Sequence, residues 1–217
     1  MLQMNNTITI EHGGAKIILP EKTVLSNYFA SLQRPGPDVI CLLNDEDIRA
    51  WHGAKEKTVN PPSLGQYWPG QGGIYAGLMR GEDGHPDYHL IVSPQQSNTQ
   101  HDLEWGARSK DEKAATSSWN GLANTEALLQ SKNSHPIVDW LRDLVIEGHS
   151  DWYVPARREA SLAAANCPEA FEPGWHWTST QYSANHAFVQ YFSDGYQLNL
   201  GKGSRFRVRA VRRFIAN

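Results

Sequence analysis

The chain is poor in cysteine, in long apolar runs and in net charge, and each shortage excludes a class of protein. Two cysteines, Cys41 and Cys167, occur among 217 residues, which excludes a disulfide framework and a cysteine-built zinc site. There is no apolar run of about 18 residues, so no membrane-spanning helix is predicted. The formal net charge of −3 provides no overall attraction to nucleic acid or to an anionic membrane.

The opening residues lack both the basic segment and the apolar stretch of a secretory signal, so we expect no signal peptide. Together with the low cysteine content, this favours a chain that is made and folded in a reducing cytoplasm. Turn-forming and indole residues are instead abundant: 18 Gly, 12 Pro and 8 Trp. The sequence therefore predicts a fold rich in turns rather than a helical bundle.

Composition and turn signals divide the chain near residues 60–65, which read Asn-Pro-Pro-Ser-Leu-Gly. We expect a small α+β unit over residues 1–62 and a larger domain over residues 63–217. Three elements are predicted in the smaller unit: a hairpin over 5–19 that turns at Gly13-Gly14, a helix over 21–33, and a buried strand over 39–43.

In the larger domain, strands are predicted first, then helices, then strands again. The expected elements are a hairpin of 72–79 with 88–92, an irregular polar stretch over 94–118, a helix capped by Asn120, a helix from Pro136 that stops at Gly148, an alanine-rich helix over 156–166, and strands within 174–215. Because strands and helices are segregated along the chain, the sequence predicts an α+β fold rather than a βαβ sheet.

Familiar catalytic motifs are missing. Nine histidines are present, but there is no His-Glu-x-x-His helix, and the pairs Asp87/His89 and His149/Asp151 have a spacing that is common by chance. There is no Gly-x-Ser-x-Gly either, and we expect Cys167 to be a buried, unreactive thiol. We therefore predict no enzyme activity, no catalytic or metal-binding residues and no cofactor.

Five arginines gather near the C-terminus: Arg205, Arg207, Arg209, Arg212 and Arg213. They could form a stripe that binds phosphates. Alternatively, they belong to a terminal strand whose Phe206, Val208 and Ala210 face the core, while the arginines pair with carboxylates. We favour the second interpretation because the whole chain is acidic, and we predict no nucleic-acid partner.

The segment 175–205 is dense in aromatic and amide side chains, which suit adaptable recognition surfaces. In the strand over 187–192, apolar side chains occupy both alternating sets, so this strand is either buried on both faces or presents aromatic rings outward. In the next strand, Leu198 and Leu200 share one face. The predicted ligand contacts are His176, Gln181, Tyr182, Asn185, His186, Tyr191, Tyr196, Gln197 and Asn199. The alternative is that the tryptophans form core and the amides are merely solvated.

Four separated motifs also carry a family resemblance. They are Asp151-Trp152-Tyr153-Val154-Pro155, then Gly174-Trp175-His176-Trp177-Thr178-Ser179-Thr180-Gln181-Tyr182, then Phe192-Ser193-Asp194-Gly195, and Arg207-Val208-Arg209-Ala210-Val211-Arg212. In this order they resemble the C-terminal domain family of bacterial collagen-like adhesins (Lcl C-terminal domain). The resemblance covers about residues 70–217 and implies a C-type-lectin-like fold, related to that of formylglycine-generating enzymes.

The chain departs from related families at three points. Sugar-binding C-type lectins use a Glu-Pro-Asn calcium loop, whereas Glu172-Pro173-Gly174 lacks the amide ligand. Formylglycine-generating enzymes use a cysteine pair, whereas Cys167 is alone in its domain. The collagen-like stem is missing too, so we expect residues 1–62 to serve as an attachment or oligomerisation unit.

The resemblance implies a non-enzymatic binding module, because family members occur as adhesin tips and as phage tail-associated proteins. We expect a receptor-binding protein of a phage tail that recognises a cell-surface protein or glycan through the 176–205 face. Its expected partners are other virion proteins and further copies of itself, as a trimer, with no membrane contact, after synthesis in the bacterial cytoplasm. Two alternatives remain: a structural virion component without a receptor role, and a metal-dependent hydrolase that uses His89, His149, His176 or His186.

Overall fold

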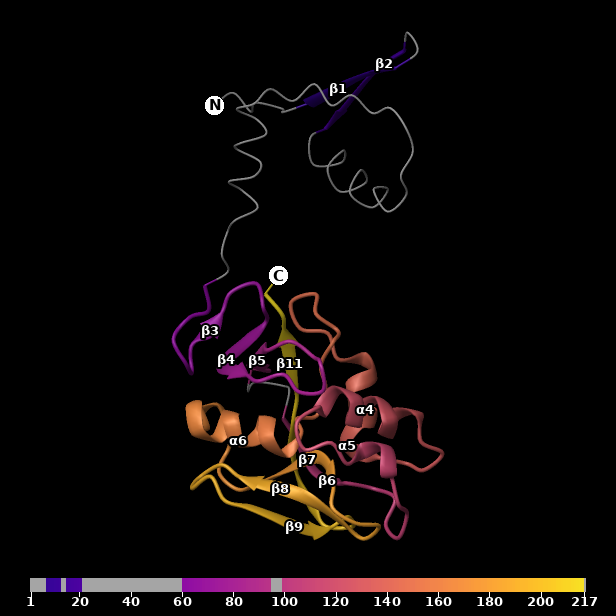
Figure 1. Ribbon diagram of the computed structural model, residues 1–217, viewed down its shortest axis with the longest axis vertical. Coiled ribbons are helices and arrows are strands. Elements are labelled where there is room, and N and C mark those ends of the chain that lie inside the picture. The colour runs from indigo at the N-terminus through magenta and orange to yellow at the C-terminus, as the bar shows by residue number, and fades with distance from the viewer. Residues whose placement is uncertain (1–6, 13–14, 21–59, 95–98, 217) are drawn as a thin grey trace. The chain divides into compact units, whose positions relative to one another are not determined.

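The computed structural model describes residues 7–12, 15–20, 60–94 and 99–216 (Figure 1). The chain divides into two units, Met1–Lys57 and Thr58–Asn217, whereas the sequence analysis placed the boundary after residue 62. In the first unit, strands β1 (Thr7–His12) and β2 (Ala15–Pro20) pair antiparallel, which confirms the two predicted strands. The predicted turn at 13–14, the helix over 21–33 and the strand over 39–43 lie outside the described residues.

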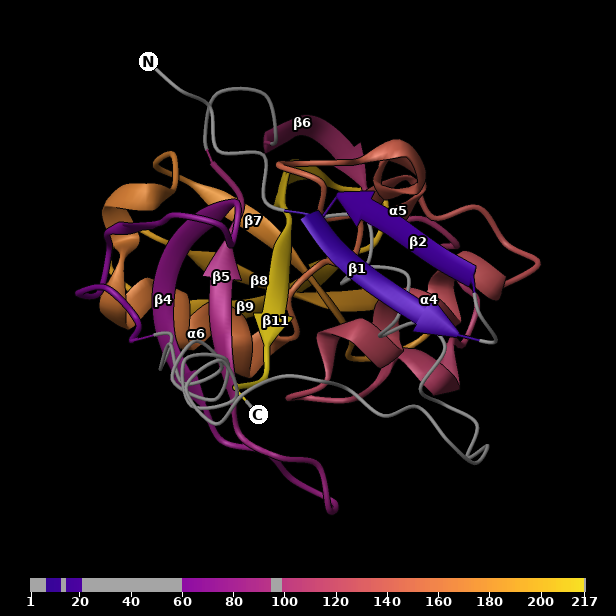
Figure 2. The same ribbon diagram turned by 90° about the horizontal axis from the view of Figure 1, so that it is seen from above.

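The second unit contains two larger sheets, of which the first has four antiparallel strands in the order β11-β5-β4-β3. Its strands are β3 (Tyr67–Trp68), β4 (Gly73–Met79), β5 (Tyr88–Val92) and β11 (Val211–Phe214). Pairing of β4 with β5 confirms the predicted hairpin of this domain. The C-terminal strand β11 lies beside β5, as Figure 2 shows, so the first and last strands of this unit belong to the same sheet.

The second sheet has five strands in the order β6-β10-β7-β8-β9. Its strands are β6 (Thr99–Glu104), β7 (Trp175–Gln181), β8 (His186–Tyr191), β9 (Gln197–Gly201) and β10 (Arg205–Arg209). Strand β10 runs parallel to β7, and the other neighbours are antiparallel. Strand β6 lies in the stretch predicted to be irregular. Its sequence, Thr-Gln-His-Asp-Leu-Glu, has no apolar alternation, so only its pairing with β10 identifies it as a strand.

Three α-helices and three short 3-10 turns complete the described part of this unit. They are α4 (Gly121–Gln130), α5 (Pro136–Asp139), α6 (Arg157–Asn166), η1 (Lys113–Ala115), η2 (Trp140–Asp143) and η3 (Pro168–Ala170). The predicted cap is confirmed, because Asn120 Oδ1 accepts a hydrogen bond from the Ala123 N–H over 3.1 Å. The alanine-rich helix is confirmed as α6.

The long helix predicted from Pro136 to Gly148 is wrong. Helix α5 ends at Asp139, the chain continues as the 3-10 turn η2, and Leu144 is extended. The indole Nε1 of Trp140 donates to the Ile137 carbonyl over 2.8 Å, a carbonyl that a continuing α-helix would use for its own ladder. The apolar residues that predicted the long helix include Ile137 and Leu141, and both are buried. Burying these two side chains needs only one or two helical turns.

Helix α6 lies between the two sheets, against β4 on one side and β8 on the other (Figure 1). Its buried side includes Ala160 and Ala163, whose small size lets both sheets approach the helix. The four-stranded sheet, helix α6 and the five-stranded sheet thus form the layers of an α+β fold. Within the described residues, no helix has the length and apolar character needed to cross a membrane.

A buried carboxylate joins these layers. Glu159 on α6 is fully buried, and Arg213 Nη2 lies 3.4 Å from its Oε1. Besides Arg213 Nη2, four donors form hydrogen bonds to its oxygens: Tyr88 Oη and Tyr153 Oη at 2.6 Å each, the Ala156 N–H at 2.7 Å and the Gly121 N–H at 3.1 Å. One side chain therefore fixes α6, β5, β11 and the start of α4.

The arginine-rich end forms strands β10 and β11, as the second interpretation predicted. Val208 and Ala210 are fully buried. Four of the arginines pair with carboxylates: Arg205 with Glu104, Arg207 with Glu172, Arg212 with Asp151, and Arg213 with Glu159. Arg209 differs, because it is buried and donates to the carbonyls of Ser93 and Ala170.

Candidate binding surface

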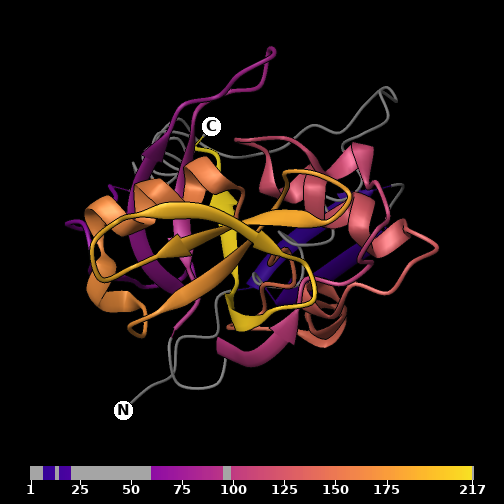
Figure 3. The same ribbon diagram turned by 90° about the horizontal axis from the view of Figure 1, so that it is seen from below.

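The β8–β9 hairpin has two sides, and the predicted contact residues are distributed over both. Side chains that face each other across an antiparallel pair share one side of the sheet. The register places Val189 opposite Leu198 and Ala187 opposite Leu200 on one side, while Phe188 with Asn199 and Gln190 with Gln197 occupy the other. Figure 3 looks onto this hairpin, with α6 behind it.

One side, which we call the aromatic face, carries rings and leucines that are not fully covered: Trp175, Tyr191, Tyr196, Leu198 and Leu200. The ring centroids of Trp175 and Tyr191 are 4.9 Å apart, and those of Trp175 and Tyr196 are 6.5 Å apart. Tyr196 is 57% exposed, and the other four are half-buried. Trp175, Leu198 and Leu200 also pack against the core cluster that holds Trp177 and Val189 on the same side of the sheet. The accessible part of this face is therefore a strip centred on Tyr196, where a phenol ring could stack against a partner.

The other side, which we call the helix side, packs toward α6. Gln197 Nε2 donates to the Arg157 carbonyl over 2.6 Å and to Gln190 Oε1 over 2.8 Å. The Arg157 guanidinium lies 4.0 Å from the centroid of the Phe188 ring. Gln197 and Asn199 therefore lie on a different side from Tyr191 and Tyr196, and the nine predicted contacts do not form one continuous surface.

A third group lies in the loop over 182–186 between β7 and β8. Tyr182 is 59% exposed and its ring packs edge-on against Phe188, with centroids 5.5 Å apart. Asn185 and His186 are exposed as well. The loop is held by the Tyr182 N–H, which donates to the His186 carbonyl over 3.0 Å, and by Ser109 Oγ, which donates to Asn185 Oδ1 over 3.0 Å. These three side chains are accessible to a partner.

His176 and Gln181, which were predicted as contacts, are only 2% and 4% exposed. The His176 ring packs edge-on against Phe171 and Phe192, and burial lowers its pKa to about 4. Its Nε2 atom is buried and has no hydrogen-bond partner among the described residues. The prediction that these two residues contact a ligand is therefore wrong for an accessible surface, because both side chains are buried around β7.

Gln181 is instead a link between β7 and the segment over 105–118. Its Oε1 atom accepts hydrogen bonds from Lys202 Nζ over 2.6 Å and from the Glu112 N–H over 2.7 Å, and its Nε2 donates to Asp111 Oδ1 over 2.7 Å. Lys202 also donates to the Lys110 carbonyl over 2.9 Å. Burial lowers the pKa of Lys202 to about 8, although the carboxylates of Glu112 and Asp111 oppose that shift.

Glu112 extends this network toward α4 and α5. Its Oε1 atom accepts three hydrogen bonds, from Asn133 Nδ2 at 2.7 Å, from Ser131 Oγ at 3.0 Å and from His135 Nε2 at 3.2 Å. Burial raises the pKa of Glu112, but the hydrogen bonds from Asn133, Ser131 and His135 outweigh it and leave the pKa below 4.5. The network therefore fixes the segment over 105–118 against β7.

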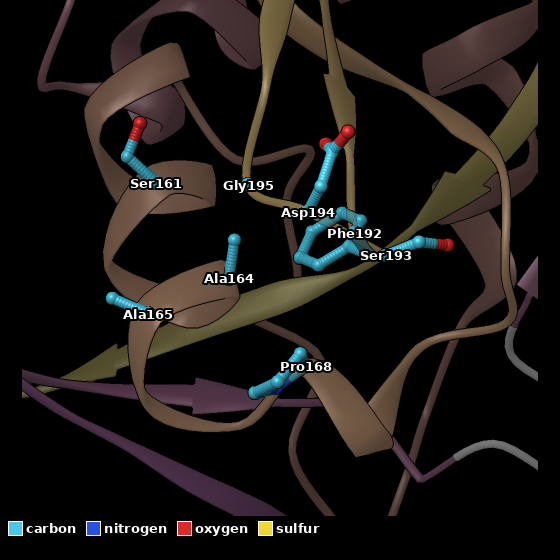
Figure 4. Close-up of a pocket in the computed structure, with 8 residues that line it drawn as sticks. All are labelled: Ser161, Ala164, Ala165, Pro168, Phe192, Ser193, Asp194 and Gly195. Carbon is cyan, nitrogen blue, oxygen red and sulfur yellow. The ribbon is translucent and has the colours of Figure 1, made fainter.

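An open pocket of about 450 Å³ lies between α6 and the turn that joins β8 to β9 (Figure 4). It is lined by Ser161, Ala164, Ala165, Pro168, Phe192, Ser193, Asp194 and Gly195. Asp194 Oδ1 accepts a hydrogen bond from the Tyr196 N–H over 2.9 Å, so this carboxylate shapes the turn that carries Tyr196. The pocket is an open depression between α6 and this turn, on the helix side of the hairpin, rather than an enclosed ligand cavity.

The four histidines considered for a metal centre lie in separate surroundings. His89 contacts Tyr75 Oη, His149 contacts the Gly70 carbonyl, His176 is buried among phenylalanines and His186 lies in the exposed 182–186 loop. Across residues 60–94 and 99–216, no three His, Cys, Asp or Glu side chains gather as metal ligands would. Cys167 is fully buried, and burial raises the pKa of its thiol to about 12. Cys41 lies outside the described residues.

The sequence analysis missed Trp175, Leu198 and Leu200 as members of the aromatic face. Leu198 and Leu200 alternate with the polar Gln197 and Asn199 in β9, and that alternation was the available signal. Neither a comparison with models of known protein families nor one with curated protein sequences gives a match to this chain. The family resemblance therefore depends on the order of the four sequence motifs.

Proposed function

We propose that residues 63–217 form a C-type-lectin-like, non-enzymatic binding module. In this proposal, the chain is a receptor-binding or adhesin protein associated with a phage tail. It recognises a protein or glycan on a bacterial cell surface through the aromatic face and the 182–186 loop. The observation that carries the proposal is the exposure of tyrosine rings at both ends of the β8–β9 hairpin: Tyr196 is 57% exposed on the aromatic face, and Tyr182 is 59% exposed in the 182–186 loop.

The contacts among the four motifs support the family resemblance. Arg212 of the last motif binds both carboxylate oxygens of Asp151 in the first motif, over 2.8 and 3.0 Å. Tyr153 of the first motif forms a backbone bridge with Val211 of the last. His176 of the second motif pairs with Arg207 in the parallel ladder. Phe192 of the third motif packs edge-on against His176, with ring centroids 5.0 Å apart. The four motifs thus belong to one packed frame, which is what a fold signature requires.

A rigid base beside the exposed rings supports a recognition role. Trp177 and Val189 are buried in the same sheet, and Trp177 Nε1 donates to the Leu103 carbonyl over 2.9 Å. Gln181 and Lys202 fix the neighbouring segment, as described above. A surface that is ordered before binding loses less conformational entropy when its partner arrives. Substitutions among the exposed rings would change specificity while the base is retained.

The test is binding of the fluorescently labelled full chain to a panel of bacterial cells and to a glycan array. We expect Tyr182→Ala, Tyr191→Ala and Tyr196→Ala each to weaken binding, because exposed tyrosines are frequent hot spots worth about 2 kcal/mol, or roughly thirtyfold. Tyr67→Ala is the matched control. Tyr67 is 40% exposed but lies on the four-stranded sheet.

Circular dichroism and the urea midpoint would show that each variant is folded. Binding at the wild-type level by the folded triple variant would contradict the assignment of this surface. Absence of binding by the wild type to every cell and glycan, together with incorporation into particles, would favour a structural virion component instead.

A further inference from the structure

Within the part of the chain that the structure describes, strand β9 is an edge of the five-stranded sheet without the usual protection against pairing. Natural sheet edges are shortened, charged, bulged or covered. The opposite edge, β6, contains Asp102 at a φ of +55° and a register irregularity opposite β10. In the other sheet, β3 has two residues, and β11 carries charged arginines and a bridge to Tyr153. Strand β9 reads Gln-Leu-Asn-Leu-Gly, with no charge and no proline, and among the described strands it pairs with β8 alone.

The hydrogen-bond phase of β9 shows which backbone groups point outward. The Tyr191 N–H donates to the Tyr196 carbonyl over 2.8 Å, and the Lys202 N–H donates to the Asn185 carbonyl over 2.9 Å. Both bonds connect to β8 or its flank, and both use even-numbered residues, Tyr196 and Lys202, at the two ends of β9. Since inward and outward groups alternate in an antiparallel ladder, the N–H and C=O of Gln197, Asn199 and Gly201 point away from β8. The Gly201 carbonyl already accepts the Ser204 N–H over 2.8 Å, which leaves both groups of Gln197 and Asn199 and the N–H of Gly201 for a partner strand.

We propose that β9 pairs antiparallel with β9 of a second copy of this chain, about a two-fold axis at Asn199. In this register Asn199 faces the second Asn199, and the two exchange both backbone hydrogen bonds. Gln197 faces the second Gly201, whose N–H donates to the Gln197 carbonyl. Leu198 then faces the second Leu200 in the closer, non-hydrogen-bonded pairs, so leucine meets leucine on the aromatic face.

Other symmetric registers fit less well. A shift by one residue would put Leu198 opposite an Asn199 that projects from the other side of the sheet. A two-fold axis at Leu198 would pair Gly201 with Gly195, whose φ of +79° belongs to the turn rather than to a strand. The axis at Asn199 keeps all five residues of β9 paired, and it joins the two aromatic faces on one side of a continuous sheet.

The first test uses proline at an outward position. Asn199→Pro removes an N–H that does not bond to β8, and edge strands tolerate proline on that side. We expect its urea midpoint to stay near that of the wild type, while its association constant falls at least tenfold. Because the interface is small, association is measured by sedimentation of the full chain from about 10 to 500 µM. Asn199→Thr keeps the N–H and should associate like the wild type.

The second test places charges at the two-fold axis, where the Cα atoms would be roughly 5.5 Å apart. Asn199→Lys and Asn199→Asp should each be monomeric alone, because like charges directly opposite repel. An equimolar mixture of the two variants should associate at least tenfold more tightly than either variant by itself. That recovery requires position 199 of one copy to face position 199 of the other.

Several outcomes would overturn the proposal. One is a wild type that stays monomeric throughout the concentration range. That result would favour pairing of β9 with an extended segment of another protein. Others are association that is unchanged in Asn199→Pro, or a trimer whose mass is insensitive to Asn199. The measurement needs no receptor, so its failure and the failure of the proposed binding function are distinguishable.

Discussion

The Nζ atom of Lys202 lies 2.6 Å from Oε1 of Gln181 and 4.3 Å from the centroid of the Trp105 ring. The lysine is buried, and the atoms it binds are neutral oxygens rather than a carboxylate. Neutral oxygens compensate only part of the cost of removing an ammonium from water, and this uncompensated cost lowers the pKa of Lys202 to about 8. The contact fastens the turn after β9 to β7 and to the segment over 105–118.

The first prediction concerns alkaline pH. Lys202 has a folded pKa of about 8 and an ordinary value of 10.5, so between these values the unfolded chain binds more protons than the folded one. The contribution of Lys202 to the free energy of unfolding should therefore rise from pH 8 to pH 10.5 and be flat below pH 8. Urea midpoints of the wild type and of Lys202→Met, compared at pH 7, 8, 9 and 10, measure this difference. A constant difference would contradict the assignment.

The second prediction concerns acid. The three hydrogen bonds to Glu112 favour its ionised form, so its stabilising contribution is complete above pH 4.5 and is lost as the pH falls through the lower folded pKa. Glu112→Gln should cost about 1–2 kcal/mol near pH 7, because a charged acceptor is replaced by a neutral one. The cost should shrink as the pH approaches 3.

The control for that measurement is Glu126→Gln, on the exposed side of α4. This variant should have a free energy of unfolding within about 0.5 kcal/mol of the wild type near pH 7, as surface substitutions usually do. An equal cost for the two glutamates would mean that the hydrogen bonds to Glu112 add nothing.

Much of the second unit could be predicted from the sequence because the signals were local. The β4–β5 hairpin, the Asn120 cap, α6 and the strands after residue 174 each follow from alternation, a capping residue or a turn. Strand β6 could not be found in this way, since its identity comes from pairing with β10, which is about a hundred residues further along the chain. The shortened helix after Pro136 could not be found either, because it depends on the hydrogen bond that the Trp140 indole donates to the Ile137 carbonyl.

The candidate surface was predicted only in part for the same reason. Tyr182 and Tyr196 are exposed, as amphipathic residues beside turns often are. Gln181 belongs to the same motif as Tyr182 but points inward, where it meets Asp111 and Lys202. Composition could not distinguish these positions, because burial of Gln181 is decided by a segment some seventy residues earlier.

The third prediction tests the buried carboxylate on α6. Glu159→Ala removes the acceptor for Tyr88, Tyr153 and two backbone N–H groups, and it leaves Arg213 beside a cavity. We expect a loss of about 3–5 kcal/mol, typical of breaking a buried charged network, measured by urea unfolding. Burial raises the pKa of Tyr153, so this phenol stays protonated and donates at neutral pH.

Glu159→Gln is the informative companion, because it keeps the shape and one acceptor oxygen while removing the charge. It should retain part of the stability lost in Glu159→Ala. If Glu159→Ala unfolds at the same urea concentration as the wild type, the carboxylate does not hold the layers together.

The fourth prediction compares two glycines in the left-handed region. Gly106 has a φ of +94°, and a Cβ there would lie 2.4 Å from the Ser134 carbonyl oxygen. Gly195 has a φ of +79°, with nothing within 4 Å of its Cβ position. Gly195→Ala should cost about 1–2 kcal/mol from backbone strain alone. Gly106→Ala adds a clash with rigid backbone and should cost about 3 kcal/mol or more.

Urea unfolding of both alanine variants separates strain from crowding, because the two positions share the backbone conformation and differ in the space around them. Gly106 also donates its N–H to the Lys202 carbonyl, so movement forced by a methyl group would loosen the segment over 105–118 where it meets the turn after β9. The peptide over 105–118 should then exchange its amide hydrogens faster in Gly106→Ala than in Gly195→Ala. Equal exchange and equal stability in the two variants would show that the contact between Gly106 and Ser134 is not tight.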